Sequence, residues 1–133
     1  MKFFFDNCIP PKLVQSLKVI VEFQGVEVIH LSEKFDRASI KDPEWIEILS
    51  KEGGWIVISA DPRITRGRAE RIAWKQSGLT GFFLSDGFAS KSIYDQAAEI
   101  FKRWPDIVRL SRENPKGQSF LITGKKPIEL LNC

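Results

Sequence analysis

One stretch in the middle of the chain most constrains the fold. Residues 53–72 read GGWIVISADPRITRGRAERI, in which a continuous apolar run follows Gly53-Gly54 and precedes Asp61-Pro62. Apolar residues at successive positions are typical of a strand that is covered by helices on both faces. In such sheets the functional residues lie just beyond the carboxyl ends of the strands, where Asp61 falls. The stretch therefore predicts a central strand that ends at a candidate site residue.

Other short apolar runs predict strands over 2–5, 26–31, 80–84 and 119–123, and residues at spacings of three and four predict the helices between them. The helices are expected from Pro10-Pro11 until Gly25 ends the first, from 42 onward, over 66–76, and over 91–103 with a restart after Pro105 to about 112. Residues 32–41 are expected to form a surface loop. Strands that alternate with helices predict one α/β domain over 1–133, a three-layer α/β/α arrangement around a mainly parallel sheet. Residues 113–133 would add a C-terminal strand and a tail.

The length and composition exclude several classes of protein. A chain of 133 residues can close one hydrophobic core, and charged residues interrupt every apolar run before it reaches membrane-spanning length. The first residues, MKFFFDN, lack the apolar core of a signal peptide. Cys8 and Cys133 have neither a disulfide framework nor metal-ligand spacing. We therefore expect a cytoplasmic protein with reduced thiols and no membrane partner.

Charge is distributed unevenly along the chain. Residues 1–62 carry 7 Lys and Arg against 10 Asp and Glu, whereas residues 63–126 carry 13 against 6. An acidic first half and a basic second half suit a site in which carboxylates hold cations beside a surface that attracts phosphates. Ordinary variation of charge along a chain is the alternative explanation.

Three aspartates are the candidate catalytic and metal-binding residues. Asp6 and Asp61 follow parallel strands and should emerge at one edge of the sheet, and Asp42 would join them if the preceding loop brings its helix to that edge. Three converging carboxylates repel one another unless a cation lies between them, and oxygen ligands favour Mg²⁺ or Mn²⁺. Each also has a local explanation: Asp42 as a helix N-cap before Pro43, Asp6 as a turn residue with Asn7, and Asp61 as a cap before Pro62. Four other acids are expected to face solvent: Asp36, Glu44, Glu47 and Asp86.

A basic segment follows the third aspartate, and it is expected to start as a short loop that holds Arg63 and Arg66. Arg63, Arg66 and Arg68 are the candidate substrate-binding residues, because guanidinium groups bind phosphate through paired hydrogen bonds. Arg68, Arg71 and Lys75 share one helical face, and Ala69, Ile72 and Ala73 are expected to face the sheet. A solvated helix face is the alternative. His30 and the four tryptophans are expected in the core.

Three blocks of the sequence resemble a known family in their order and spacing. FFFDNCIPPKL, the helix start DPEWI, and WIVISADPRI followed by a strand FFL are similar to the PIN-like domain family, and within it to the VapC-type toxin branch. The resemblance covers about residues 2–112. It implies a metal-dependent ribonuclease with its acidic cluster at Asp6, Asp42 and Asp61, a cognate antitoxin protein as partner, and a possible homodimer.

The sequence departs from this family at one position near the candidate site. PIN nucleases commonly carry a fourth acid shortly after the one that ends the central strand, whereas Arg63 follows Pro62 here. The departure is compatible with fewer ligands or with a domain that binds RNA or protein without cutting. It is also compatible with a ligand borrowed from elsewhere in the chain, for which the candidates are Glu44, Glu47 and Asp86.

These observations lead to one functional hypothesis and two alternatives. The hypothesis is a Mg²⁺- or Mn²⁺-dependent endoribonuclease that is the toxin of a type II toxin–antitoxin pair, with RNA as substrate. One alternative is a catalytically inactive PIN-like module that binds RNA or protein. The other is a receiver-type phosphoacceptor domain, because Asp6, Asp61, Ser85 and Lys125 follow strands as a receiver's functional residues do. Against the receiver, Asp6 is followed by Asn7 instead of a second acid.

Overall fold

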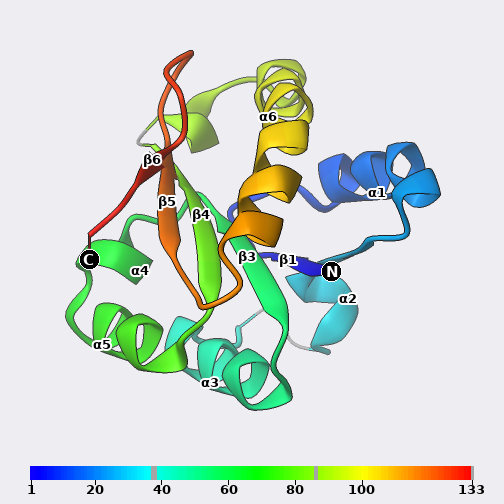
Figure 1. Ribbon diagram of the computed structural model, residues 1–133. Helices are drawn as coiled ribbons and strands as arrows, with labels where there is room; N and C mark the ends of the chain where they lie inside the picture. The colour runs from blue at the N-terminus through cyan, green and yellow to red at the C-terminus, as the bar shows by residue number, and fades with distance from the viewer. Residues whose placement is uncertain (37–38, 86, 133) are drawn as a thin grey trace.

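A computed structural model describes residues 1–36, 39–85 and 87–132, and a single mainly parallel sheet organises them (Figure 1). The strand order is β2-β1-β3-β4-β5-β6, in which β6 alone is antiparallel to its neighbour. The strands are β1 (Lys2–Phe5), β2 (Glu27–His30), β3 (Trp55–Ser59), β4 (Thr80–Leu84), β5 (Ser119–Ile122) and β6 (Glu129–Leu130). All five strands predicted from the sequence are present, and β6 lies in the C-terminal tail to which no element was assigned.

Helices cover both faces of this sheet, with α1 and α6 on one side and α3 and α5 on the other (Figure 1). The α-helices are α1 (Pro11–Ile20), α2 (Leu31–Lys34), α3 (Asp42–Glu52), α4 (Arg63–Arg66), α5 (Arg68–Ser77) and α6 (Ile93–Glu113). Two short 3-10 helices are η1 (Glu22–Gln24) and η2 (Phe88–Ser90). The α/β/α arrangement predicted from the sequence is therefore confirmed.

The first strand shows how one run of apolar residues supplies two cores. Phe3 and Phe5 pack in the core beneath α1 and α6, whereas Phe4 packs in the core beneath α3 and α5. The ring of Phe3 lies 4.6 Å from that of Trp104 in α6, and the ring of Phe4 lies 4.9 Å from that of Trp45 in α3. Since successive side chains of a strand point to opposite faces, the uninterrupted apolar runs are explained by this double coverage. The expectation that the tryptophans are core residues is confirmed, because all four are buried.

Three local expectations about the helices are wrong. The helix α6 runs through Pro105 without a restart, because Trp104, Ile107 and Val108 on either side of the proline stay buried against the sheet. That packing offsets the roughly 3 kcal/mol that an interior proline costs a helix. The single turn α4 occupies residues that were expected to form a loop. In α5, Ala73 packs against the core as expected, but Ala69 and Ile72 are exposed and the buried residue is Trp74. Gly81 in β4 leaves the space that the Trp74 ring fills.

The polar segment after β2 also differs from the surface loop expected over 32–41. It starts with the one-turn helix α2, which a capping box explains. The Nδ1 atom of His30 accepts a hydrogen bond from the backbone N–H of Ser32 at 3.0 Å, and Glu33 accepts one from the backbone N–H of His30 at 3.2 Å. His30 itself is buried, as expected. Residues 37 and 38 lie outside the described part of the chain.

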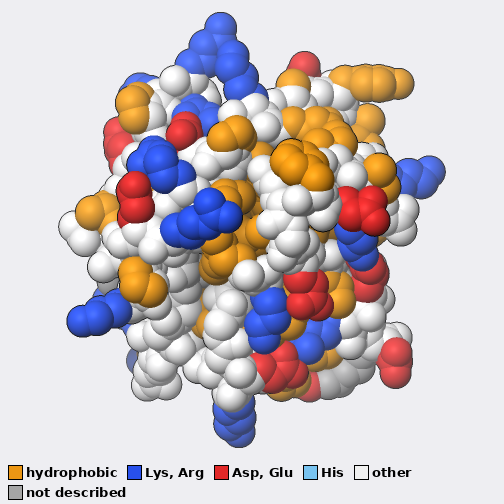
Figure 2. Space-filling view, turned by 45° about the vertical axis from the view of Figure 1, so that its right-hand side comes forward, with side chains coloured by type: hydrophobic (Ala, Val, Ile, Leu, Met, Phe, Trp, Pro, Cys, Tyr) orange, Lys and Arg blue, Asp and Glu red, His pale blue; other side chains and the backbone are white. Residues whose placement is uncertain are grey.

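The surface carries charges of both signs. Figure 2 shows one face on which hydrophobic side chains lie in a hollow and basic and acidic side chains are interspersed around it. The large hydrophobic side chains with the greatest exposure are Phe23 and Tyr94, each 83% exposed, and Val19, at 72%. In the described part of the chain, none of the helices combines the length and the apolar character needed to cross a membrane.

Gly117, in the turn before β5, provides a sharp test of the packing at the end of the sheet opposite the candidate site. Its φ of +77° is unfavourable for other residues, and an added Cβ would collide with the backbone carbonyl of Gly78. We expect Gly117→Ala to lower the free energy of unfolding by more than about 2 kcal/mol. Gly25→Ala is the matched control, because Gly25 has a φ of +68° but open space around it, and it should cost only about 1 kcal/mol. Urea denaturation measures both, and equal losses would contradict the steric explanation.

Candidate active site

The topology of the sheet places two of the predicted aspartates at one crevice. From β1 the chain moves to β2 on one side, and from β2 it crosses to β3 on the other side of β1. Ligands of open α/β sheets bind at this kind of reversal, outside the carboxyl ends of the strands. Asp6 follows β1, and its backbone N–H still bonds the Ile58 carbonyl of β3 at 3.3 Å. Asp61 lies two residues after β3.

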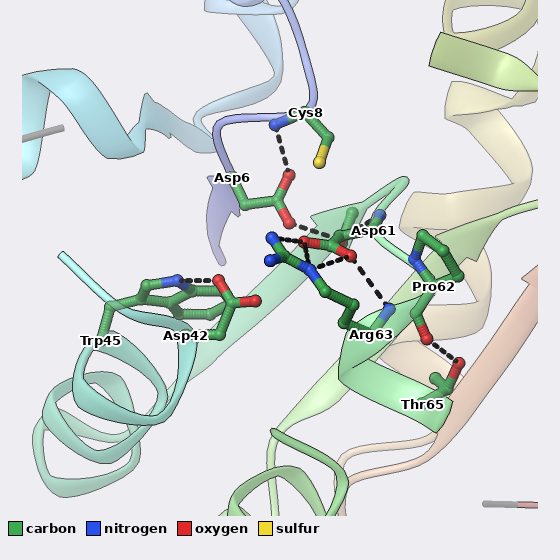
Figure 3. A network of polar contacts seen from close by, with 9 residues as sticks. Asp6, Cys8, Asp42, Trp45, Asp61, Pro62, Arg63 and Thr65 are labelled. Atoms are coloured by element: carbon green, nitrogen blue, oxygen red, sulfur yellow. Dashed lines mark hydrogen bonds and ion pairs between the residues drawn. The ribbon is translucent and has the colours of Figure 1, made fainter. Parts of the chain in front are cut away.

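Asp42 reaches the same edge because β2 ends there and α3 runs back from it toward the start of β3. The residue was expected to be an N-cap, but Lys41 occupies that position and Asp42 is the first residue of the helix. Its carboxylate accepts a hydrogen bond from the indole Nε1–H of Trp45 at 3.0 Å. Figure 3 shows Asp6, Asp42 and Asp61 pointing into a common space. The structure therefore brings the three predicted acids together.

Asp6 is the most deeply buried of the three, at 2% exposed. One carboxylate oxygen accepts the backbone N–H of Cys8 at 3.0 Å, and the other accepts the hydroxyl of Ser59. Burial raises the pKa of Asp6 to about 7 against the lowering effect of these two hydrogen bonds, and the nearby carboxylates of Asp42 and Asp61 raise it further. A carboxyl group in this environment gains stability from a proton or from a cation.

Asp61 has a different environment, because Arg63 neutralises it. The guanidinium of Arg63 donates from Nη2 to one Asp61 oxygen at 2.6 Å and from Nε to both oxygens at 3.1 Å, and the Arg63 backbone N–H donates at 2.9 Å. Burial opposes ionisation of Asp61, but these hydrogen bonds and the Arg63 charge hold its pKa below the usual range. The Arg63 side chain is 70% exposed whereas that of Asp61 is 7% exposed, so the ion pair reaches solvent on the arginine side. Arg63, which the sequence suggested as a substrate-binding residue, is thus paired with one of the candidate acids in the structure.

The other candidate basic residues lie further along the same segment. Arg66 ends α4 and Arg68 begins α5, and both are exposed, as are Arg71 and Lys75. Arg66 lines a cavity together with Asp61, whereas α5 leads away from the acids, so that Lys75 lies near Gly78 and Gly117 at the opposite end of the sheet. A phosphate bound at Arg66 would therefore lie near Asp61.

Ser59 is a site residue that the sequence reading missed. Its side chain is fully buried, donates a hydrogen bond to Asp6 and accepts the backbone N–H of Asp61 at 3.0 Å. It therefore links the two acids that come from different strands. The available signal was a hydroxyl residue at the end of an otherwise apolar strand, two positions before the candidate acid.

Electrostatics around the three acids indicates a site for positive charge. Burial raises the pKa of Asp42, the hydrogen bond from Trp45 lowers it, and the charge of Asp61 raises it again. Burial also raises the pKa of the Cys8 thiol to about 12, and the three acids add to this effect. The pKa values of Asp6, Asp42 and Cys8 are thus all raised in part by neighbouring negative charge.

The donor set agrees only partly with a bound metal ion. Within residues 1–36, 39–85 and 87–132, no group of three or more His, Cys, Asp and Glu side chains is arranged to hold a metal ion. Mg²⁺, however, commonly keeps several waters and takes only one or two carboxylates together with substrate phosphate. Asp6 and Asp61, linked through Ser59, offer such a pair of hard oxygen ligands. Of the possible borrowed ligands, Asp86 lies outside the described residues.

Comparison with known proteins places the chain in a family. A family model described as PIN-like domain matches residues 1–86, more than half of the chain, so the protein belongs to the PIN-like domain family. PIN-like domains are usually nucleases, and the fold is of nuclease type. No curated protein and no solved structure matched the chain. The matched segment contains β1, α3, β3 and all three acids.

Proposed function

We propose that the protein is a divalent-metal-dependent endoribonuclease. The observation that carries the proposal is the convergence of Asp6, Asp42 and Asp61 at the reversal point of a PIN-like sheet, where burial raises the pKa of Asp6. Asp6 and Asp61 would hold Mg²⁺ or Mn²⁺. Such an ion supplies Lewis-acid polarisation of a phosphodiester and activation of a bound water.

The remaining residues bind and orient the substrate in this proposal. Asp42 accepts a proton from the attacking water or fixes its position, because its carboxylate lies beside that of Asp61. Arg63 turns from Asp61 toward the scissile phosphate, and its exposure leaves room for that movement. Arg66 and Arg68 bind the neighbouring phosphates. The guanidinium fork suits this exchange, since carboxylate and phosphate present similar pairs of oxygens.

Cleavage by the purified protein tests the proposal. We expect single-stranded RNA of mixed sequence to be cut in Mn²⁺ or Mg²⁺ and to stay intact in EDTA. Asp61→Asn should lower the rate by about 100-fold or more, because the site loses a charged ligand. Asp36→Asn removes an exposed carboxylate and should leave the rate unchanged. Cutting that continues in Asp61→Asn would refute the assignment.

We further propose that the nuclease is the toxin of a type II toxin–antitoxin pair and acts in the cytoplasm. The resemblance to VapC-type toxins supports this, and exposed Val19, Ile20 and Phe23 on α1 and η1 offer an apolar surface for an antitoxin or a second copy. Induced expression should arrest growth, and Asp61→Asn should not. Co-expression of a small protein encoded beside the gene should relieve the arrest. If the protein cuts RNA but its expression does not arrest growth, the nuclease has a role other than that of a toxin.

One observation favours a second candidate, a PIN-like module that binds RNA or protein without cutting. Arg63 already supplies a cation to Asp61, so a metal ion must compete with it. If the site takes a metal ion, Arg63→Gln should tighten Mn²⁺ binding about tenfold, a factor that corresponds to about 1.4 kcal/mol. Arg71→Gln, with the same change of net charge at an exposed position, is the control. Calorimetry that detects no Mn²⁺ binding in either variant would favour the binding module.

A further inference from the structure

A second feature lies on the other side of Asp61. A cavity of about 230 Å³ opens at the carboxyl ends of β3, β4 and β5, and we refer to it as the Asp61 cavity. It is lined by Asp61, Pro62, Thr65, Arg66, Phe83, Leu84, Ser85, Leu121, Leu131 and Asn132. Neither Asp6 nor Asp42 contributes to its wall. In Figure 3, Pro62 and Thr65 lie on the side of Asp61 away from those two acids.

The walls of the Asp61 cavity combine two kinds of surface. Phe83 and Leu84 from β4, Leu121 from β5 and Leu131 after β6 are apolar. Thr65, Ser85 and Asn132 add hydroxyl and amide groups. The Thr65 hydroxyl donates to the Pro62 carbonyl at 3.3 Å, and its oxygen keeps lone pairs that can accept a hydrogen bond. With Asp61 and Arg66, half of the lining residues are polar or charged and half are apolar, a mixture that suits a flat heterocycle whose edge carries donors and acceptors.

The size and position of the cavity limit what it can hold. Pockets for drug-sized ligands span about 300–1,000 Å³, so a volume of about 230 Å³ suits one nucleobase and not a whole nucleotide pair. Asp61 is shared between this cavity and the acid group. A ligand whose ring occupied the cavity would therefore hold its backbone phosphate near the acids, within the basic segment of Arg63, Arg66 and Arg68.

We propose that the Asp61 cavity receives one unpaired nucleobase of a single-stranded RNA whose phosphate lies at the acid group. The proposal rests on the ribonuclease function for its substrate class, RNA. It adds a subsite that favours single-stranded over double-stranded RNA. A base held in a duplex cannot enter such a cavity without leaving its stack, whereas a single strand presents bases that are free to enter. The chain would then discriminate single-stranded from double-stranded RNA through this cavity.

Binding measured without metal separates this proposal from the cleavage mechanism. Fluorescence anisotropy in EDTA would compare a seven-nucleotide oligouridine with a fully abasic strand of the same length. We expect the wild-type protein to prefer the strand with bases by about tenfold or more. Leu131→Trp fills the cavity and should lower that ratio about tenfold, whereas Leu130→Trp, at the neighbouring exposed position that does not line the cavity, should preserve it. Affinity for the abasic strand should be equal in both variants.

A second variant guards against a folding defect in Leu131→Trp. Thr65→Phe fills the cavity from α4, and thermal unfolding identifies which of the two variants is intact. Equal ratios in the cavity variants and in Leu130→Trp would overturn the proposal, as would a wild-type protein that binds both strands alike. Either result would leave the ribonuclease function standing if the wild-type protein still cuts RNA in Mn²⁺. If the wild-type protein prefers the strand with bases but does not cut RNA, the proposed role of the cavity would hold and the proposed nuclease activity would be refuted.

Discussion

Asparagine in place of Asp6 is expected to stabilise the metal-free protein at pH 8 by a few kcal/mol while abolishing RNA cleavage. In the wild-type protein the buried carboxyl has a pKa of about 7, against 3.8 for an ordinary aspartate. Its ionised form is therefore costly in the folded state. The amide of asparagine imitates the protonated carboxyl in shape and hydrogen bonding, so it removes that cost and also removes the charge that a metal ion requires.

The pH dependence of this effect has a definite sign. Below about pH 4 the carboxyl is protonated in both the folded and unfolded states and makes no difference to stability. Between about pH 4 and pH 7 the folded protein binds the extra proton, so the wild-type free energy of unfolding falls as the pH rises through this window. About 3 pKa units at about 1.4 kcal/mol each set an upper limit of about 4 kcal/mol. Asp6→Asn should flatten this part of the profile.

Urea denaturation in EDTA between pH 4 and pH 8 measures the effect. Asp36→Asn, which removes an exposed carboxylate, should follow the wild-type curve. Added Mn²⁺ should raise the stability of the wild-type protein above pH 7 and leave Asp6→Asn unchanged, because binding to the folded state alone stabilises it. Equal stability of wild-type and Asp6→Asn at pH 8 in EDTA would contradict the idea that Asp6 is held ionised at a cost.

The sequence was sufficient for the sheet because its apolar runs leave few alternatives. The residues of β1 and β3 must be covered on both faces, which requires a parallel sheet between helices and sends Asp6 and Asp61 to one edge. The position of Asp42 depended on a loop whose path no local pattern specifies. Only the crossing from β2 to β3 shows that α3 begins at that edge.

The side-chain contacts of the site could not be predicted in the same way. Arg63 is two residues from Asp61, and a sequence pattern does not distinguish an arginine that awaits phosphate from one that binds its neighbouring acid. The role of Ser59 depends on the register between β1 and β3, which places its hydroxyl against Asp6. The continuous α6 depends on the burial of Trp104 and Ile107, which outweighs the local effect of Pro105. In each case long-range packing decides between local alternatives.

Trp45 connects the core with the candidate site, and its replacement by alanine should have the largest effect on stability. The side chain is fully buried and packs on Phe4, so Trp45→Ala is expected to cost about 3–5 kcal/mol in the free energy of unfolding. Trp45→Phe keeps most of the ring volume and should cost less. It also removes the Nε1–H that donates to Asp42 at 3.0 Å, which separates the contribution of the hydrogen bond from that of packing.

The loss of that donor should change the pH profile of cleavage. The hydrogen bond from Trp45 lowers the pKa of Asp42, so its removal in Trp45→Phe raises this pKa. The acidic limb of the pH profile of cleavage should therefore move to higher pH. Trp104→Phe is the matched control: Trp104 is buried on the opposite face of the sheet and donates to Gln24 at 3.1 Å. Trp104→Phe should lose a similar amount of stability and leave the pH profile of cleavage unshifted. An identical shift in both variants would show that Asp42 is not the group that titrates.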